Sequence, residues 1–203
     1  MAKGEQTVAP LRSPMMEAQT TAVPLCVDLD GTLIFTDLLW VSLVQQCKCR
    51  PWHLLFALAC LWQGRARLKR RLAIPTALNL SVLPYNTHLL RFLRAEASRG
   101  RALYLVTGSD ILLAEQVATY LPVFHEVIAS DGRRNLTGKK KAAVLVARFG
   151  TGGFDYVGNS RSDFAVWAKA RHAFVVNLTP RAYRRALRRF AVRGVFPGPE
   201  LPQ

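Results

Sequence analysis

Short apolar runs alternate with longer amphipathic stretches along most of the chain. Short runs typical of strands cover residues 25–27, 102–106, 127–129, 154–157 and 173–176. Helical spacing of apolar residues covers 87–98, 110–121, 140–149, 162–170 and 180–193. Strands that alternate with helices in this way predict a mostly parallel sheet with helices on both faces. The predicted fold class is therefore α/β, a Rossmann-like three-layer sandwich.

The segment between the first two predicted strands has helical rather than strand spacing. Apolar residues recur at helical intervals from Thr36 to about Ala73, and Pro51 is placed to open a second helix. We interpret residues 36–85 as a small helical cap inserted into the α/β domain. The apolar stripe from Trp52 to Trp62 in this segment is more typical of core packing than of a lipid site.

The two ends of the chain differ from its centre. Residues 1–21 mix Gly, Pro, Gln, Thr and Ser without periodicity, which predicts a disordered leader. Residues 22–180 are expected to form the α/β domain with its cap. Residues 181–203 are expected to form a basic C-terminal helix and a loose tail that contains several prolines.

The charge balance is strongly basic, with 28 Lys and Arg against 13 Asp and Glu and a net charge of +15. Such an excess predicts an anionic partner, which can be a phosphorylated substrate, an acidic membrane surface or nucleic acid. Nucleic acid is the least supported, because the basic residues lack interleaved aromatic residues and no known reader motif is present. The predicted C-terminal helix contributes Arg181, Arg184, Arg185, Arg188, Arg189 and Arg193.

The sequence predicts a cytoplasmic protein that contacts the inner membrane only peripherally. No apolar run follows Lys3, and the apolar stretch 54–62 is far shorter than the roughly 20 residues that a spanning helix needs. The cysteines have no zinc-site spacing and are expected to be reduced and structural. The Trp52–Trp62 stripe and the basic run 65–71 that follows it are the segments expected to meet an anionic bilayer.

Four polar clusters follow predicted strands or open a later helix, where parallel strands present ligands at one edge of the sheet. They are Asp28-Leu-Asp-Gly-Thr32, Thr107-Gly108-Ser109, Lys139-Lys140-Lys141 and Gly158-Asn159-Ser160-Arg161-Ser162-Asp163. Two carboxylates two positions apart can supply a nucleophile and a proton shuttle. Hydroxyl and backbone N–H groups can hold phosphate oxygens, a lysine can balance their charge, and oxygen ligands can hold Mg²⁺.

In this order the four clusters resemble the motifs of the haloacid dehalogenase-like superfamily, over roughly residues 24–178. The resemblance implies that Asp28 is the nucleophile and Asp30 the general acid/base. It implies phosphate binding by Thr107, Gly108 and Lys141, with Lys139 and Lys140 as alternatives to Lys141. The implied Mg²⁺ ligands are the Asp28 carboxylate, the Asp30 main-chain carbonyl and the fourth motif, represented here by Asn159 and Asp163.

The fourth motif departs from the family pattern. Its first position is normally an aspartate that binds the metal directly, but this chain has Asn159 there. An amide oxygen can bind Mg²⁺ but brings no negative charge, so weaker metal binding is expected. Asp163 keeps the second acidic position.

A finer resemblance links the chain to the hydrolase domain that is fused ahead of UbiA-type membrane prenyltransferases. It rests on Thr36-Asp-Leu-Leu39, Gly64-Arg-Ala66, Leu68-Lys69 and Tyr156-Val-Gly-Asn-Ser-Arg161. The resemblance implies a lipid-linked substrate and a membrane prenyltransferase as partner. The chain would correspond to the hydrolase half of such a protein, ending where the membrane domain would begin.

The function expected from the sequence is Mg²⁺-dependent hydrolysis of a phosphate monoester, through an aspartyl-phosphate at Asp28. The substrate would be a phosphorylated small molecule or a lipid-linked phosphate. The alternative is a catalytically weak domain of the same fold that docks on a membrane or on a prenyltransferase.

Overall fold

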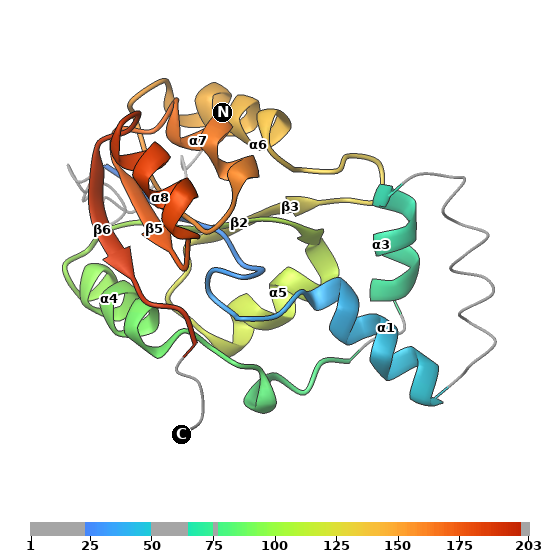
Figure 1. Ribbon diagram of the computed structural model, residues 1–203. Helices are drawn as coiled ribbons and strands as arrows, with labels where there is room; N and C mark the ends of the chain where they lie inside the picture. The colour runs from blue at the N-terminus through green and yellow to red at the C-terminus, as the bar shows by residue number, and fades with distance from the viewer. Residues whose placement is uncertain (1–22, 50–64, 75–76, 200–203) are drawn as a thin grey trace, which may run out of the picture.

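The protein is built around a six-stranded sheet, seen in a computed structural model that describes residues 23–49, 65–74 and 77–199 (Figure 1). The strand order is β3-β2-β1-β4-β5-β6, and every neighbouring pair is parallel. The strands are β1 (Leu25–Val27), β2 (Leu103–Asp110), β3 (Glu126–Ser130), β4 (Asp155–Gly158), β5 (Ala173–Val176) and β6 (Val192–Phe196). The expected leader and the Trp52–Trp62 stripe lie outside the described residues.

The central strand β1 shows why these segments form strands without alternating polarity. Leu25 and Val27 pack in the core on one face of the sheet, whereas Cys26 packs in a second core on the other face, and all three are fully buried. A strand that is covered on both faces reads as a continuous apolar run. The parallel, doubly covered sheet predicted from the sequence is confirmed.

Helices from different parts of the chain cover the two faces. On one face lie α4 (Thr87–Ser98) and α5 (Ile111–Tyr120). On the other lie α6 (Lys139–Phe149), α7 (Phe164–Trp167) and α8 (Pro180–Leu187) (Figure 1). Each layer contributes small or aliphatic side chains to its core, such as Leu93 from α4 and Leu145 from α6, both fully buried.

In the described part of the segment between β1 and α4, the helices α1 (Leu38–Cys49) and α3 (Arg65–Ala73) pack against each other. They lie beside the end of the sheet toward which β2 points, and α3 contacts β2 and α5 (Figure 1). A short 3-10 turn, η2 (Leu80–Val82), precedes an antiparallel bridge between Ile34 and Tyr85 that closes the base of this segment. The helix expected to start at Pro51 lies outside the described residues.

Two helices are shorter than the sequence pattern predicts. The predicted helix 162–170 consists of the 3-10 turn η3 (Arg161–Asp163) followed by the one-turn helix α7. The predicted helix 180–193 is wrong in its second half, because α8 ends at Leu187 and residues 192–196 form β6. Among the described residues, no helix is both long enough and apolar enough to cross a bilayer.

The difference at β6 is explained by tertiary packing. Arginine favours helix, so the arginine-rich sequence predicts helix past the point where the periodicity changes from helical to alternating. In β6 the burial alternates along the strand, and Gly194 lies directly against the Phe174 ring, where an added Cβ would come within 2.7 Å. Phe196 packs against Phe92 of α4, with ring centroids 5.2 Å apart. Tertiary packing therefore fixes this segment as an edge strand.

The buried carboxylate of Asp155 stabilises the amino-terminal end of β4 through hydrogen bonds and ion pairs. Asp155 is 2% exposed and accepts hydrogen bonds from the guanidinium groups of Arg101 and Arg171 and from the backbone N–H of His172. Burial alone would raise the pKa of Asp155, but the two arginines outweigh it and lower the pKa. This cluster joins the segments that lead into β2, β4 and β5.

We predict that Asp155→Asn lowers the free energy of unfolding at neutral pH by about 3 kcal/mol, because it leaves the largely buried Arg101 without a full counter-charge. Since the folded-state pKa is depressed, the charged carboxylate stabilises the protein above about pH 4 and the effect fades as the pH falls through the folded pKa. Urea unfolding at several pH values measures both effects.

The control is Glu126→Gln, which breaks the ion pair with Arg148 where both side chains are 39% exposed. A pair of this kind contributes no more than about 1 kcal/mol. Equal losses in the two variants would contradict a special role for the Asp155 cluster.

Candidate functional site

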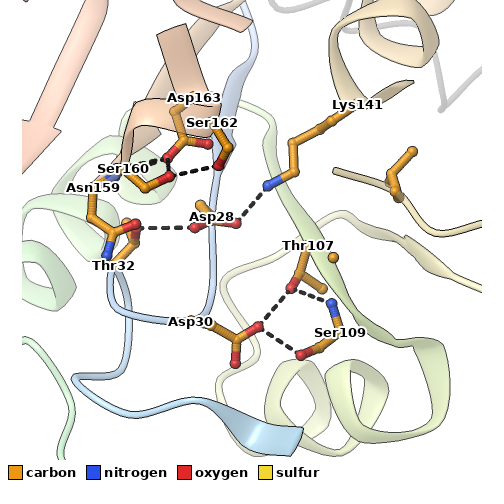
Figure 2. A network of polar contacts seen from close by, with 12 residues as sticks. Asp28, Asp30, Thr32, Thr107, Ser109, Lys141, Asn159, Ser160, Ser162 and Asp163 are labelled. Atoms are coloured by element: carbon orange, nitrogen blue, oxygen red, sulfur yellow. Dashed lines mark hydrogen bonds and ion pairs between the residues drawn. The ribbon is translucent and has the colours of Figure 1, made fainter. Parts of the chain in front are cut away.

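The first polar cluster forms a tight turn at the carboxyl end of β1. The Asp28 N–H donates to Val157 O (3.0 Å), which continues the pairing with β4 for one more residue. Leu29 O then accepts from the N–H groups of Thr32 (3.2 Å), Leu33 (2.9 Å) and Ile34 (3.1 Å), while the Leu29 side chain is fully buried in the core. Because side chains alternate around Leu29, Asp28 and Asp30 both face the space beyond the sheet edge (Figure 2).

Asp28 is the centre of a chain of buried polar groups. Its Oδ1 accepts from Lys141 Nζ (2.6 Å) and its Oδ2 from Thr32 Oγ1 (3.2 Å) (Figure 2). Lys141 Nζ also donates to the Tyr156 hydroxyl (2.9 Å), which in turn donates to Asp163 Oδ1 (3.0 Å). These contacts bring together residues from the first, third and fourth clusters, together with a tyrosine in β4.

Burial sets the electrostatics of this chain. It raises the pKa of Asp28 to about 7, helped by the Asp163 and Asp30 carboxylates, although Lys141 lowers it. Burial alone would lower the pKa of Lys141, but the carboxylates of Asp28, Asp163 and Asp30 outweigh it and raise the pKa. Lys139 and Lys140 are exposed, so Lys141 is the member of the triple lysine that reaches Asp28.

Asp30 has a separate set of partners. Its Oδ2 accepts from Ser109 Oγ (2.6 Å) and Thr107 Oγ1 (3.2 Å), and its Oδ1 from the N–H of Leu38 (2.8 Å) at the start of α1 (Figure 2). Burial outweighs these hydrogen bonds and raises its pKa. Thr107, expected to bind phosphate, therefore lies beside the carboxylate expected to shuttle protons.

The fourth cluster is a loop that Asp163 organises from within. Asp163 Oδ2 accepts from the N–H groups of Asn159 (3.2 Å) and Ser160 (2.9 Å) and from Ser160 Oγ (2.8 Å). With Tyr156 on the other oxygen, both Asp163 oxygens accept hydrogen bonds from protein groups. Asp163 thus holds the loop in place, and its role as a direct metal ligand stays a prediction.

Asn159 lies against the turn that carries the two aspartates. Gly31 has a positive φ of 74°, and an added Cβ there would come within 2.0 Å of Asn159 Nδ2. The glycine therefore satisfies two requirements, a left-handed backbone and room for the Asn159 side chain. Asn159 of the fourth cluster therefore lies next to the first cluster.

The residues at this sheet edge offer the kind of ligand atoms that a hard divalent cation prefers. The candidate ligands offer only oxygens, from the Asp28 carboxylate, the Asp30 carbonyl and the Asn159 amide, and such ligands suit Mg²⁺. Among the described residues, no group of three or more His, Cys, Asp or Glu side chains is arranged to hold a metal.

A lysine of α3 approaches the second cluster. Lys69 Nζ of α3 donates to the carbonyl oxygen of Gly108 (2.6 Å) and to Asn135 Oδ1 (3.2 Å). The same carbonyl accepts from Ser130 Oγ of β3 (2.8 Å), so Gly108 is hydrogen-bonded both to α3 and to the sheet. Next to Lys69, Arg70 pairs with Asp110 (2.9 Å) and seats α3 on the end of β2.

Two participants were not identified from the sequence as site residues. Tyr156 lies within a predicted strand, where a tyrosine is typical of core packing, and only the fold places its hydroxyl between Lys141 and Asp163. Lys69 belongs to a basic run that is typical of a solvated helix face. For Tyr156, the sequence offers no signal beyond the presence of a hydroxyl in a predicted strand.

Comparison by sequence gives a limited result. No protein-family model matches the chain. A protein of unknown role from Sinorhizobium fredii (strain NBRC 101917 / NGR234), y4nM, is 35% identical over 154 residues, which cover 76% of this chain. The match covers only 30% of the length of y4nM.

Comparison by structure defines the fold. A protein of unknown function from Bordetella pertussis Tohama I matches with a TM-score of 0.62 at 12% identity, over 85% of this chain and 97% of that one. A HAD family hydrolase from Salmonella enterica serovar Typhi matches with a TM-score of 0.56 at 12% identity, over 80% and 66% of the two chains. A phosphoserine phosphatase, solved as a phospho-aspartyl intermediate analogue, matches with a TM-score of 0.53 at 13% identity, over 85% and 91%.

The close approach of Asn159 to Gly31 yields a test. We predict that Gly31→Ala lowers the free energy of unfolding by about 1–2 kcal/mol for the left-handed backbone, and further because Asn159 must move. The matched control is Gly152→Ala, which has nearly the same φ of 73° but no atom within 4 Å of the added Cβ. Denaturant unfolding of both variants should show a larger loss for Gly31→Ala, and equal losses would contradict the contact.

Proposed function

The chain has the fold of haloacid dehalogenase-like phosphatases, and we propose that it hydrolyses a phosphate monoester through an aspartyl-phosphate formed on Asp28, with Mg²⁺. The observation that carries the proposal is the different setting of the two aspartates. Asp28 is paired with the ammonium of Lys141, whereas Asp30 is surrounded by hydroxyl and N–H donors. Two carboxyl groups with different settings can take different roles in one reaction.

In the first step, a carboxylate oxygen of Asp28 attacks phosphorus, and the bond from phosphorus to the ester oxygen breaks. The leaving oxygen takes a proton from Asp30, whose raised pKa favours the protonated form that this step requires. Lys141 holds the attacking carboxylate in position and balances negative charge next to it. Thr107, beside Asp30, is placed to donate to a phosphate oxygen once its bond to Asp30 is exchanged.

In the second step, Asp30, now a carboxylate, takes a proton from water as the water attacks the phosphorus of the aspartyl-phosphate. The bond between phosphorus and the Asp28 oxygen breaks, which releases phosphate and restores both carboxyl groups. Ser109 and the N–H of Leu38 keep Asp30 oriented in both steps. Because the Leu38 N–H begins α1, the cap helps to set the position of the proton shuttle.

The Asp28 carboxylate, the Asp30 carbonyl and the Asn159 amide oxygen would hold the Mg²⁺. When bound, the cation neutralises negative charge on the phosphoryl group and on Asp28. The oxygen-only character of these candidate ligands supports this assignment. The uncharged Asn159 leads us to expect weaker binding than a site with an additional carboxylate would give.

A second candidate function is a weakly active domain that docks on an anionic membrane or on a membrane prenyltransferase. Two observations favour it: the amide at position 159, and the relative y4nM, of which the matched segment is only 30%. A domain joined to a membrane enzyme would act on a lipid-linked phosphate at the bilayer surface. Turnover of a chromogenic phosphate ester, with and without Mg²⁺, separates catalysis from docking alone.

We predict that Asp28→Asn abolishes phosphatase turnover, because an amide cannot form the covalent intermediate, while the fold is retained. Loss of a nucleophile typically lowers kcat by several orders of magnitude, about 10⁴-fold or more. The control Asp131→Asn removes an exposed carboxylate and should leave turnover unchanged. Substantial turnover by Asp28→Asn, in a preparation free of other phosphatases, would overturn the assignment of the nucleophile.

We also predict that Asn159→Asp lowers the Mg²⁺ concentration that gives half-maximal activity, because it adds a charged oxygen ligand. The extra carboxylate should also destabilise the protein without Mg²⁺ and increase the rise in melting temperature when Mg²⁺ is added. The control Asn79→Asp makes the same charge change at an exposed position in the cap segment. An unchanged Mg²⁺ response in Asn159→Asp would place that residue away from the metal.

A further inference from the structure

A pocket of about 440 Å³ lies between η3, α7 and α8, and four arginines line it. The lining residues are Arg161, Phe164, Arg181, Ala182, Arg185 and Arg189. Arg161 belongs to the loop that also carries Asn159, and α8 follows the carboxyl end of β5 (Figure 1). The pocket therefore opens near the same sheet edge as the candidate active site, but its lining residues are different.

The arginines of this pocket have no anionic partner within the described part of the chain. No carboxylate there forms an ion pair with Arg161, Arg181, Arg185 or Arg189. The Arg185 guanidinium lies 5.8 Å from the centroid of the Phe164 ring, which holds the cation at the pocket wall. Like charges gathered without a counter-ion repel one another, and a bound anion would relieve that repulsion.

The arrangement on α8 distinguishes a pocket from a general basic surface. Arg181 and Arg185 lie four residues apart on one side of α8, and Arg189 follows in the turn after the helix; all three line the pocket. Arg184 and Arg188 are equally exposed but do not line it. A guanidinium offers several N–H donors in a planar fork that matches phosphate oxygens.

We propose that this pocket binds a phosphate or diphosphate group, as a second anion site beside the candidate active site. The ligand can be a free phosphate compound or the phosphate of a lipid headgroup, since both present the same oxygens to the arginines. The proposal rests on the pocket and does not require that the protein is a phosphatase. It assigns anion binding to only some of the arginines of the basic C-terminal segment, because only part of that segment lines the pocket.

The test compares two double variants of the full chain. Arg181→Gln with Arg185→Gln removes two charges from the pocket, and Arg184→Gln with Arg188→Gln removes two charges from the same helical segment outside it. Titration with inorganic diphosphate at low salt, in the absence of divalent cations, measures the dissociation constant by calorimetry. We expect the pocket pair to weaken binding at least tenfold and the control pair less than threefold. All these arginines are exposed, so both variants should melt within a few degrees of the unaltered protein.

Vesicles identify the source of the ligand. If the pocket takes a lipid phosphate, the pocket pair should lower binding to phosphatidylcholine vesicles that contain phosphatidic acid, and the control pair should not. If it takes a free phosphate compound, diphosphate binding alone should depend on the pocket pair. Equal weakening by both pairs would show a diffuse basic surface and overturn the proposal. Diphosphate binding that survives in the pocket pair would overturn it as well, because the anion would then be bound elsewhere, for example at Thr107.

Discussion

The buried ion pair between Asp28 and Lys141 is the interaction on which the arrangement of the site depends. It joins the end of the central strand β1 to the first turn of α6, and neither side chain is more than 10% exposed. Loss of one partner from such a pair typically costs about 3–5 kcal/mol, because an uncompensated charge is left in the interior. The hydroxyl groups of Thr32 and Tyr156 and the carboxylate of Asp163 are the further polar groups that make this burial tolerable.

The fold and the site differ in how far they could be predicted from the sequence. The parallel sheet follows from apolar runs such as Leu25–Val27, because burial on both faces leaves a local pattern. The position of Lys141 at Asp28 depends on contacts across 113 residues and was predicted only through the resemblance of ordered motifs. Tyr156 and the edge strand β6 escaped prediction because tertiary neighbours decide them: the hydroxyl needs Lys141 and Asp163, and Gly194 needs the ring of Phe174.

The charge of the protein is distributed unevenly, and this has a consequence for ligands. The chain as a whole carries a net charge of +15, yet the centre of the candidate site gathers the carboxyl groups of Asp28, Asp30 and Asp163 around Lys141. A phosphate that approaches is attracted by the basic exterior but repelled by the aspartates at close range. A divalent cation at Asp28 removes this conflict, which gives the electrostatic reason why a phosphatase with these residues would require one.

The arginine pocket changes how the basic surface is understood. A charge excess that served only solubility or loose attraction would need no particular geometry, and Arg184 and Arg188 are compatible with such a role. Arg161 and Arg185 instead converge on one cavity, with Phe164 as an aromatic wall. Because Arg161 and Asn159 share one loop, held by hydrogen bonds to Asp163, an anion in the pocket would contact the same loop that contributes to the candidate metal site. Long-range attraction, anion binding and catalysis would then be served by neighbouring parts of one sheet edge.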